Sequence, residues 1–131
     1  MQLDSIHVLV VDDVKTTRIL AEDLLMQVGF KKIDTAASVQ DAQEIMESHS
    51  VHMVLSDWHM SPNTGLELLK WVRVHEKYKN LPFIFFTAEK TKECVMQAIE
   101  NKVDGYLLKP LTPEQVEEKV FQVLSKKGVL T

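Results

Sequence analysis

Five short apolar runs, separated by longer amphipathic stretches, constrain the fold of this chain more than any other feature. The runs lie at residues 6–11, 32–37, 51–56, 83–86 and 105–108. Uninterrupted apolar runs of this length are typical of strands that are buried on both faces, as in parallel sheets. The second run is the weakest of the set. The runs therefore predict five strands.

Apolar residues in the intervening stretches recur at helical spacing. In the first stretch Leu20, Leu24 and Val28 share one face, with Ala21 and Leu25 beside them. The other four faces consist of Ala42, Ile45 and Met46; Leu66, Leu69 and Val72; Val95, Ala98 and Ile99; and Val116, Val120, Val123 and Leu124. Hydroxyl residues suited to cap three of these helices are Ser38, Thr91 and Thr112. The stretches therefore predict one helix after each strand.

This alternation predicts an α/β protein in which a strand–helix unit is repeated five times. Such chains form a parallel sheet with helices on both faces and right-handed crossovers. The length of 131 residues fits one domain, and a chain of this size folds without a metal or a disulfide. We therefore expect one doubly wound domain over residues 1–131, with ligands bound beyond the carboxyl ends of its strands.

Composition narrows the class of protein. Nineteen acidic residues against 15 basic ones give a net charge of −4, so the basic footprint of a nucleic-acid-binding module is missing. Cys94 is the only cysteine, which fits a reducing compartment. The amino-terminal residues lack the basic segment of a signal peptide, and no apolar stretch approaches the roughly 18 residues of a membrane span. We expect a cytoplasmic monomer without nucleic-acid or membrane partners.

Chemically competent side chains follow four of the five apolar runs. Asp12 and Asp13 come after the first run, Asp57 after the third, Thr87 after the fourth and Lys109 after the fifth. In a sheet with strand order 2-1-3-4-5, these four strands are consecutive neighbours. Their carboxyl ends then meet at one edge of the sheet, where three carboxylates, a hydroxyl and an ammonium group would converge.

The physical chemistry of such a cluster limits its function. Three neighbouring carboxylates repel one another and have raised pKa values unless a cation joins them. Mg²⁺ suits a partly hydrated carboxylate site that also holds a phosphate. A carboxylate placed beside Mg²⁺ and the ammonium group of Lys109 is suited to attack phosphorus and form an acyl phosphate.

The chain resembles the receiver domains of two-component response regulators, and most of all the stand-alone chemotaxis regulators. The matching segments are VVDD ending at Asp13, SDWHM around Asp57, GLELLKWVR from Gly65, FTAE containing Thr87 and GYLLKP ending at Pro110. The resemblance covers essentially the whole chain. It implies a flavodoxin-like fold with strand order 2-1-3-4-5 and a single receiver domain with no output domain. A receiver is a signalling domain, not an enzyme with a separate substrate.

The resemblance also assigns the phosphoryl and metal sites. It implies that Asp57 accepts the phosphoryl group, and that Thr87 and Lys109 hold it. The implied Mg²⁺ ligands are Asp13, Asp57 and the backbone carbonyl of His59, with Asp12 acting through water. His59 and Glu89 match two positions that tune the rate of dephosphorylation in this family, although the role of His59 is equally well explained by its carbonyl alone.

The switch implied by the resemblance is a population shift. Phosphorylation moves Lys109 and draws Thr87 inward, which leaves room for the switch aromatic Tyr106 to turn in. The peptide between Lys109 and Pro110 matches one that is usually cis in the family. Residues that match the target-binding face are Lys92, Val95, Tyr106 and Lys119. The implied partners are a histidine kinase, a downstream target of the flagellar motor switch type and a dedicated phosphatase.

One loop departs from the family pattern. Ser61 stands where the usual sequence has proline four residues after the acceptor, and the proline follows at position 62. Thr64 replaces a common Asp before Gly65. The missing ring at Ser61 frees a backbone N–H and relaxes the φ angle. This change affects the stiffness of the loop on the metal side and removes no ligand.

Alternative functions use similar parts. A stand-alone receiver also serves as a phosphate sink or as an intermediate in a phosphorelay, with the same acceptor site. A phosphohydrolase with an aspartyl-phosphate intermediate usually needs a cap over its substrate, for which this chain leaves no residues. A flavin- or nucleotide-binding domain needs a loop rich in Gly, Ser and Thr after the first strand. The acidic Asp12-Asp13 pair at that position would repel phosphate without a metal.

Overall fold

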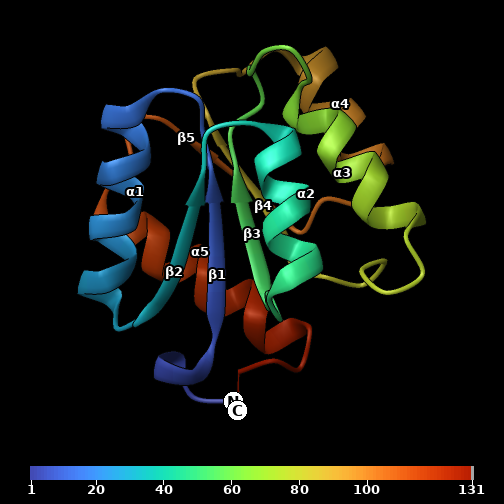
Figure 1. The fold of residues 1–131 in the computed structure, drawn as a ribbon. Coiled ribbons are helices and arrows are strands. Elements are labelled where there is room, and N and C mark those ends of the chain that lie inside the picture. The colour runs from blue at the N-terminus through green and yellow to red at the C-terminus, as the bar shows by residue number, and fades with distance from the viewer. Residues whose placement is uncertain (131) are drawn as a thin grey trace.

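The structure of the protein, a computed structural model, describes residues 1–130 and contains five strands and five α-helices in strict alternation (Figure 1). The strands are β1 (His7–Val11), β2 (Lys32–Ala36), β3 (Met53–Ser56), β4 (Phe83–Thr87) and β5 (Gly105–Leu108). The helices are α1 (Lys15–Val28), α2 (Val39–Ser48), α3 (Gly65–Val74), α4 (Lys92–Glu100) and α5 (Pro113–Lys126), and a short 3₁₀ helix spans Leu3–Ser5.

The sheet is parallel throughout, and its strand order is β2-β1-β3-β4-β5. The predicted fold and strand order are therefore confirmed. The central strands β1, β3 and β4 are almost completely buried, because helices cover both of their faces. The weakest predicted strand, β2, lies at an edge and is half exposed.

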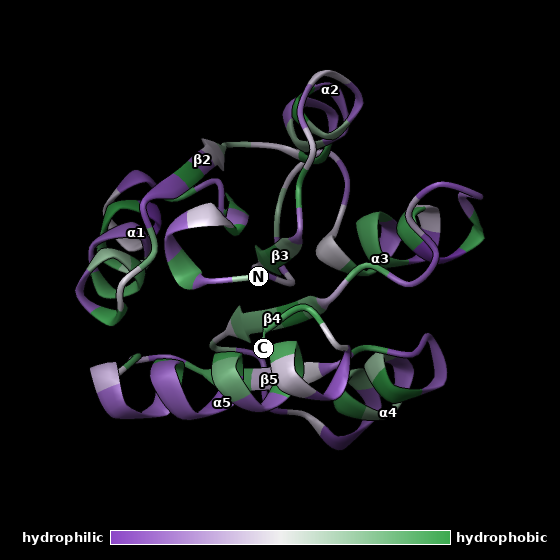
Figure 2. Ribbon diagram, turned by 90° about the horizontal axis from the view of Figure 1, so that it is seen from below, coloured by the Kyte–Doolittle hydropathy of each residue, from purple (hydrophilic) through white to green (hydrophobic). Residues whose placement is uncertain are grey.

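Two hydrophobic cores lie on opposite faces of the sheet. Helices α1 and α5 cover one face, and α2, α3 and α4 cover the other. In Figure 2 each helix carries green hydrophobic residues together with purple hydrophilic ones, as expected for helices that bury one side. Among residues 1–130, no helix is both long enough and apolar enough to cross a membrane.

Two residues of the predicted helical faces are placed differently in the structure. Leu20 is 46% exposed and Ile99 is 59% exposed. The buried stripe of α1 consists of Ala21, Leu24 and Leu25, and at about 100° per residue this places Leu20 outside it. The sequence pattern identified the right helices, but the buried faces it predicted for α1 and α4 are shifted by about one residue.

Side-chain caps begin four of the helices. Ser38, Thr91 and Thr112 each accept a hydrogen bond from the backbone N–H three residues later, as the sequence predicts. Thr64 does the same for α3. Helix α1 has no such cap at Val14, whose N–H instead donates to the Asp12 carboxylate at 2.9 Å. The Asp12 carboxylate thus contacts the backbone N–H group of the residue that precedes α1.

Candidate functional site

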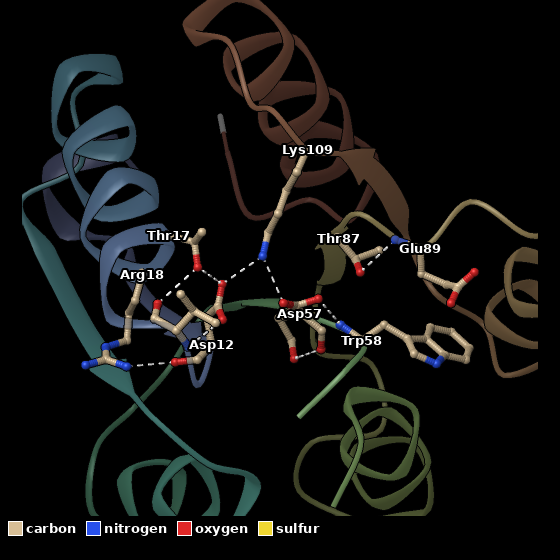
Figure 3. A network of polar contacts seen from close by, with 10 residues as sticks. Asp12, Thr17, Arg18, Asp57, Trp58, Thr87, Glu89 and Lys109 are labelled. Atoms are coloured by element: carbon tan, nitrogen blue, oxygen red, sulfur yellow. Dashed lines mark hydrogen bonds and ion pairs between the residues drawn. The ribbon is translucent and has the colours of Figure 1, made fainter. Parts of the chain in front are cut away.

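Three charged side chains from three strand ends meet at the carboxyl edge of the sheet (Figure 3). The ammonium Nζ of Lys109 donates to Asp57 Oδ2 at 2.8 Å and to Asp12 Oδ2 at 3.0 Å. Asp12 is fully buried and Asp57 is 7% exposed. The shared ammonium group offsets the repulsion between these two neighbouring carboxylates.

The same contacts keep Lys109 charged. Burial alone would lower the pKa of Lys109, but the hydrogen bonds and charges of Asp57 and Asp12 outweigh it and raise the pKa above its ordinary value. Nζ also lies 5.0 Å from the centre of the Phe86 ring, a favourable position for a cation. Lys109 is therefore a fixed positive charge that points at Asp57.

The first turn of α1 holds Asp12 in place. The Thr17 hydroxyl donates to Asp12 Oδ2, and Arg18 Nη1 donates to the backbone carbonyl of Asp12 at 2.8 Å. Neither residue was among the sequence-predicted site residues. The available signal was their position one helical turn beyond the acidic pair, which is weak because many polar residues occupy such positions without contacting a strand end.

Asp57 is positioned by backbone contacts on both sides. Its N–H donates to Val11 O at 2.9 Å, and its Oδ1 accepts the Trp58 N–H at 2.6 Å. The start of α3 then returns to this strand end, because the Gly65 N–H donates to Trp58 O at 2.8 Å. A Cβ at Gly65 would lie 2.0 Å from the Asp57 carbonyl oxygen, so only glycine allows this approach.

Thr87 ends β4 beside Asp57 but is turned to another partner. Its hydroxyl, which is almost fully buried, accepts the Glu89 N–H at 3.1 Å. Its carbonyl accepts the Lys109 N–H at 3.0 Å, which ties the ends of β4 and β5 together. Within residues 1–130, no hydrogen bond joins the Thr87 hydroxyl to Asp57 or to the Lys109 side chain.

His59 and Glu89 form a bridge between the loop after β3 and the loop after β4. His59 Nε2 donates to Glu89 Oε1 at 2.6 Å. The His59 side chain is 65% exposed, whereas that of Glu89 is 16% exposed. The hydrogen bond from His59, followed by those from Thr91, lowers the pKa of the Glu89 carboxyl to about 2. Glu89 is thus ionised at neutral pH and available to hold His59.

Tyr106 is joined to the same loop. Its hydroxyl donates to the Glu89 carbonyl at 2.7 Å. Burial, followed by nearby negative groups, raises the pKa of Tyr106 to about 12, so the phenol keeps the proton that it donates. Ring contacts of 5.0 Å between Trp58 and Phe85 and of 5.8 Å between Phe85 and Tyr106 form a continuous aromatic row. This row connects Tyr106 to the residue beside Asp57.

The predicted partner-binding residues lie on three elements, α4, β5 and α5. Tyr106 and Lys119 line a shallow cavity of about 330 Å³ between β5 and α5. Lys92 is exposed at the first turn of α4, and Val95 is half buried on the same helix, but neither lines that cavity. The peptide between Lys109 and Pro110 is cis, as predicted, and the peptide between Ser61 and Pro62 is cis as well.

The donor set near Asp57 fits a hydrated magnesium ion. Two buried carboxylates, those of Asp12 and Asp57, share a single ammonium group, which leaves excess negative charge. Mg²⁺ typically uses one or two carboxylates and keeps several waters. Asp13 follows Asp12 in the chain but is exposed, and no three His, Cys, Asp or Glu side chains among residues 1–130 form a compact metal-holding group. The structure therefore brings two of the three expected carboxylates together.

Comparisons with known proteins place this geometry in context. A family model described as the response regulator receiver domain matches residues 8–121. The chemotaxis protein CheY of Pseudomonas aeruginosa is 32% identical over 119 residues, covering 91% of this chain and 96% of that protein. Chemotaxis protein CheY-3 of Vibrio cholerae is 31% identical over 122 residues, covering 93% and 94%. The solved structure of Vibrio cholerae CheY4 aligns with a TM-score of 0.84 and 29% identity, covering 91% and 98%.

Proposed function

Because this chain belongs to the response regulator receiver domain family of two-component signalling, we propose that it is a switch that accepts a phosphoryl group on Asp57. The observation that carries the proposal is the Lys109 ammonium group held between the buried carboxylates of Asp57 and Asp12. The proposed donor is the phosphohistidine of a histidine kinase. The protein then acts as a signalling domain whose only chemistry is its own phosphorylation and dephosphorylation.

In the proposed reaction, an Asp57 carboxylate oxygen attacks the phosphorus atom of the donor. A P–O bond forms, the P–N bond to the kinase imidazole breaks, and the imidazole nitrogen leaves with the electron pair. The backbone N–H of Trp58, 2.6 Å from Asp57 Oδ1, fixes the plane of the attacking carboxylate. Lys109 stabilises charge on the transferred phosphoryl oxygens, since its ammonium is already within 2.8 Å of Asp57.

We propose Mg²⁺ as the cofactor of this site. When bound, it supplies positive charge beside Asp57 and the incoming phosphoryl group. Its proposed ligands are Asp13, Asp57 and the backbone carbonyl of His59, with Asp12 acting through water. The excess negative charge of the Asp12–Asp57–Lys109 cluster supports this assignment.

The proposed output runs through the face formed by α4, β5 and α5. After phosphorylation, the Thr87 hydroxyl leaves the Glu89 N–H and turns to the phosphoryl group. The loop that carries Glu89 also accepts the Tyr106 hydroxyl, so its movement changes the setting of Tyr106. This shift alters the face that contains Lys92, Val95 and Lys119. The chemotaxis relatives support a role in chemotaxis. We propose the flagellar motor switch as the target, with a dedicated phosphatase ending the signal.

Tryptophan fluorescence tests the acceptor site directly. Trp58 adjoins Asp57 and Trp71 lies on α3, so a Trp71→Phe background makes the signal specific for the site. Mg²⁺ is added first, followed by acetyl phosphate or a beryllofluoride mimic, in parallel with Asp57→Asn. We expect a Mg²⁺-dependent change and a phosphoryl adduct by intact mass only when Asp57 is present. Absence of the adduct in both proteins would overturn the proposal.

Binding to a motor-switch peptide tests the output. We expect the beryllofluoride-loaded protein to bind this peptide more tightly than the untreated protein does. Equal binding in the two states would instead favour a phosphate sink or a phosphorelay intermediate, both of which use the same acceptor.

A further inference from the structure

A basic cavity lies at the end of the sheet opposite to the Asp57 site. Its volume is about 680 Å³, and it is lined by the carboxyl ends of α3 and α4, the residue after α5 and the segments that lead into β4 and β5. Figure 2 views the molecule from this end. Strand β4 runs from Phe83 to Thr87 and a strand rises about 3.3 Å per residue, so the cavity lies about 13 Å from Thr87. It is therefore distinct from the proposed phosphoryl site.

The cavity carries the opposite charge to the chain as a whole. Its five cationic and two anionic side chains give an excess of three positive charges, whereas the whole chain has a net charge of −4. The cations are Lys70, Arg73, Lys79, Lys102 and Lys127, and the anions are Glu100 and Asp104. Such a concentration of one sign in an acidic protein creates a local attraction for negatively charged partners.

Part of this charge is committed to holding the fold together. Arg73 Nη2 donates to Asp104 Oδ2 at 2.9 Å, and Lys127 Nζ lies 3.1 Å from Asp104 Oδ1. Arg73 also donates to the carbonyl oxygens of Leu81 at 2.7 Å and Lys102 at 2.8 Å. These groups form the floor of the cavity and need no further partner.

The remaining cations are free to bind a ligand. Within residues 1–130, the ammonium groups of Lys70 and Lys102 make no hydrogen bond or ion pair. Lys79 makes only a 3.4 Å contact with Glu76, and because both side chains are more than half exposed this pair contributes little. Lys102 also has φ 64°, a left-handed conformation that favours glycine or asparagine, so its backbone gives no reason for a lysine there.

Compensation of helix dipoles accounts for neither Lys70 nor Lys79. Basic side chains in the last turn of a helix interact favourably with its carboxyl end, but this effect fades beyond that turn. It explains Arg73 in the last turn of α3, as well as Lys102 and Lys127, which follow the carboxyl ends of α4 and α5. Lys70 precedes the last turn of α3, and Lys79 lies in the loop before β4.

An exposed apolar side chain lies among these charges. Val74 lines the cavity and is 83% exposed, the highest value among the exposed large hydrophobic residues. Val103 contributes a second, partly buried apolar surface. A ligand that matches this lining carries carboxylates around an aliphatic or aromatic side chain, which is the chemistry of an acidic peptide.

We propose that this cavity docks an acidic peptide segment of a partner protein. Carboxylates of the segment pair with Lys70, Lys79 and Lys102, and its apolar side chain covers Val74. Because the cavity lies at the opposite end of the sheet from Asp57, the contact is independent of phosphorylation. It would tether the receiver to an assembly both before and after the switch.

Fluorescence anisotropy with a defined probe tests this docking. The probe is a short fluorescein-labelled peptide of Glu and Asp with one central Leu, and its lysine counterpart serves as the control peptide. We expect the acidic probe to bind and the lysine peptide not to bind. The affinity for the acidic probe should fall as the salt concentration is raised, because salt screens exposed charges. We expect Lys70→Glu/Lys102→Glu to lower the affinity by about tenfold or more, since like charges then face each other. Asp57→Asn should bind as the wild type does.

Matched variants separate the cavity from net charge. Lys31→Glu/Lys32→Glu makes the same charge change at two exposed residues, one just before β2 and one at its first position, and should alter affinity by less than twofold. Val74→Ser should weaken binding of the peptide but not binding of inorganic pyrophosphate. No binding of the acidic probe, or an equal loss in both double variants, would overturn the proposal. Pyrophosphate that displaces the probe at equal concentration would also overturn it, in favour of a small-anion site.

Discussion

Two partly buried ion-pair clusters lie at opposite ends of the sheet, and they differ in their balance of charge. At the carboxyl ends of the strands, two carboxylates, Asp12 and Asp57, share the single cation Lys109. At the amino ends, two cations, Arg73 and Lys127, share the single carboxylate Asp104. Similar groups at similar distances therefore leave negative charge in excess at one end and positive charge at the other.

The pKa directions reflect this difference. Burial lowers the pKa of Arg73, and the single carboxylate of Asp104 only partly opposes the effect. For Lys109, two carboxylates outweigh burial and raise the pKa. The negative charge around Lys109 is thus more than Lys109 can neutralise. Binding of a further cation, or a rearrangement of charge, is therefore favourable at this site.

The two clusters also differ in how completely their hydrogen bonds are made. Arg73 and Asp104 are connected to backbone groups of the segments before β4 and β5, including the Phe83 N–H at 2.9 Å from Asp104. Asp57, in contrast, has one backbone donor and one ammonium partner. We infer that the amino-end cluster fastens the fold, whereas the carboxyl-end cluster is free to exchange partners.

The largest expected effect is at the carboxyl end. Asp57→Asn removes the proposed nucleophile, so we expect no phosphoryl adduct after treatment with acetyl phosphate and Mg²⁺, measured by intact mass. Stability should not decrease, because Lys109 keeps Asp12 as its partner and one like-charge repulsion is lost. An adduct on the Asn variant would mean that another residue is the acceptor.

The opposite pattern is expected at the amino end. Arg73→Met leaves Lys127 as the remaining ion-pair partner of Asp104 and removes the donors to three backbone carbonyl oxygens. We expect the free energy of unfolding to fall by about 3 kcal/mol, measured by urea denaturation. The rate of phosphorylation by acetyl phosphate should stay within twofold. Arg73→Lys should recover part of the stability, and a fold that tolerates Arg73→Met without loss would contradict the fastening role.

The sequence predicted the carboxyl-end site better than the amino-end cluster, and the reason is geometric. Strand ends can be identified from local apolar runs, and parallel strands bring those ends together, so Asp57, Thr87 and Lys109 could be assigned to one edge. The pair between Arg73 and Asp104 joins residues 31 positions apart in the chain on a helix end and a loop. No periodic pattern marks such a contact.

The sequence also did not predict the direction in which each side chain points. The prediction that three carboxylates converge did not anticipate that Asp13 is exposed while Asp12 is buried. Neighbouring residues at a strand end point in different directions, and which one points inward depends on packing against α1. The contact of Thr17 with Asp12 depends on the same packing and was missed for the same reason.

A histidine at the amino end provides a smaller test of the comparison. His52 Nδ1 accepts the His7 N–H at 2.9 Å, which it can do only while that nitrogen is unprotonated. Burial, followed by the positive charge of neighbouring groups, lowers the pKa of His52 from 6.5. The unfolded chain therefore binds more protons as the pH falls below about 6.5, and stability decreases in that window.

His52→Gln keeps an acceptor but cannot titrate. Both proteins should lose stability between neutral and mildly acid pH. We expect the variant's free energy of unfolding to fall by about 1 kcal/mol less than that of the wild type, because one hydrogen bond is worth about that much. Urea denaturation at several pH values measures the difference. Phosphorylation should be unaffected, and identical pH profiles for the two proteins would show that the His52–His7 contact does not control acid stability.

The smallest expected effect is at the carboxyl end and concerns rate, not stability. The bridge from His59 to Glu89 spans the loops beside Asp57, where water would approach the proposed acyl phosphate. We expect His59→Ala to shorten the lifetime of the phosphoryl group by about two- to fivefold, a modest change because His59 is largely exposed. Glu89→Gln should have a similar effect, and combining the two substitutions should add little, because both break one contact. Decay of the phosphoryl adduct, followed by intact mass, measures all four proteins. Fully additive effects would show that His59 and Glu89 act on water separately and that the bridge itself has no role.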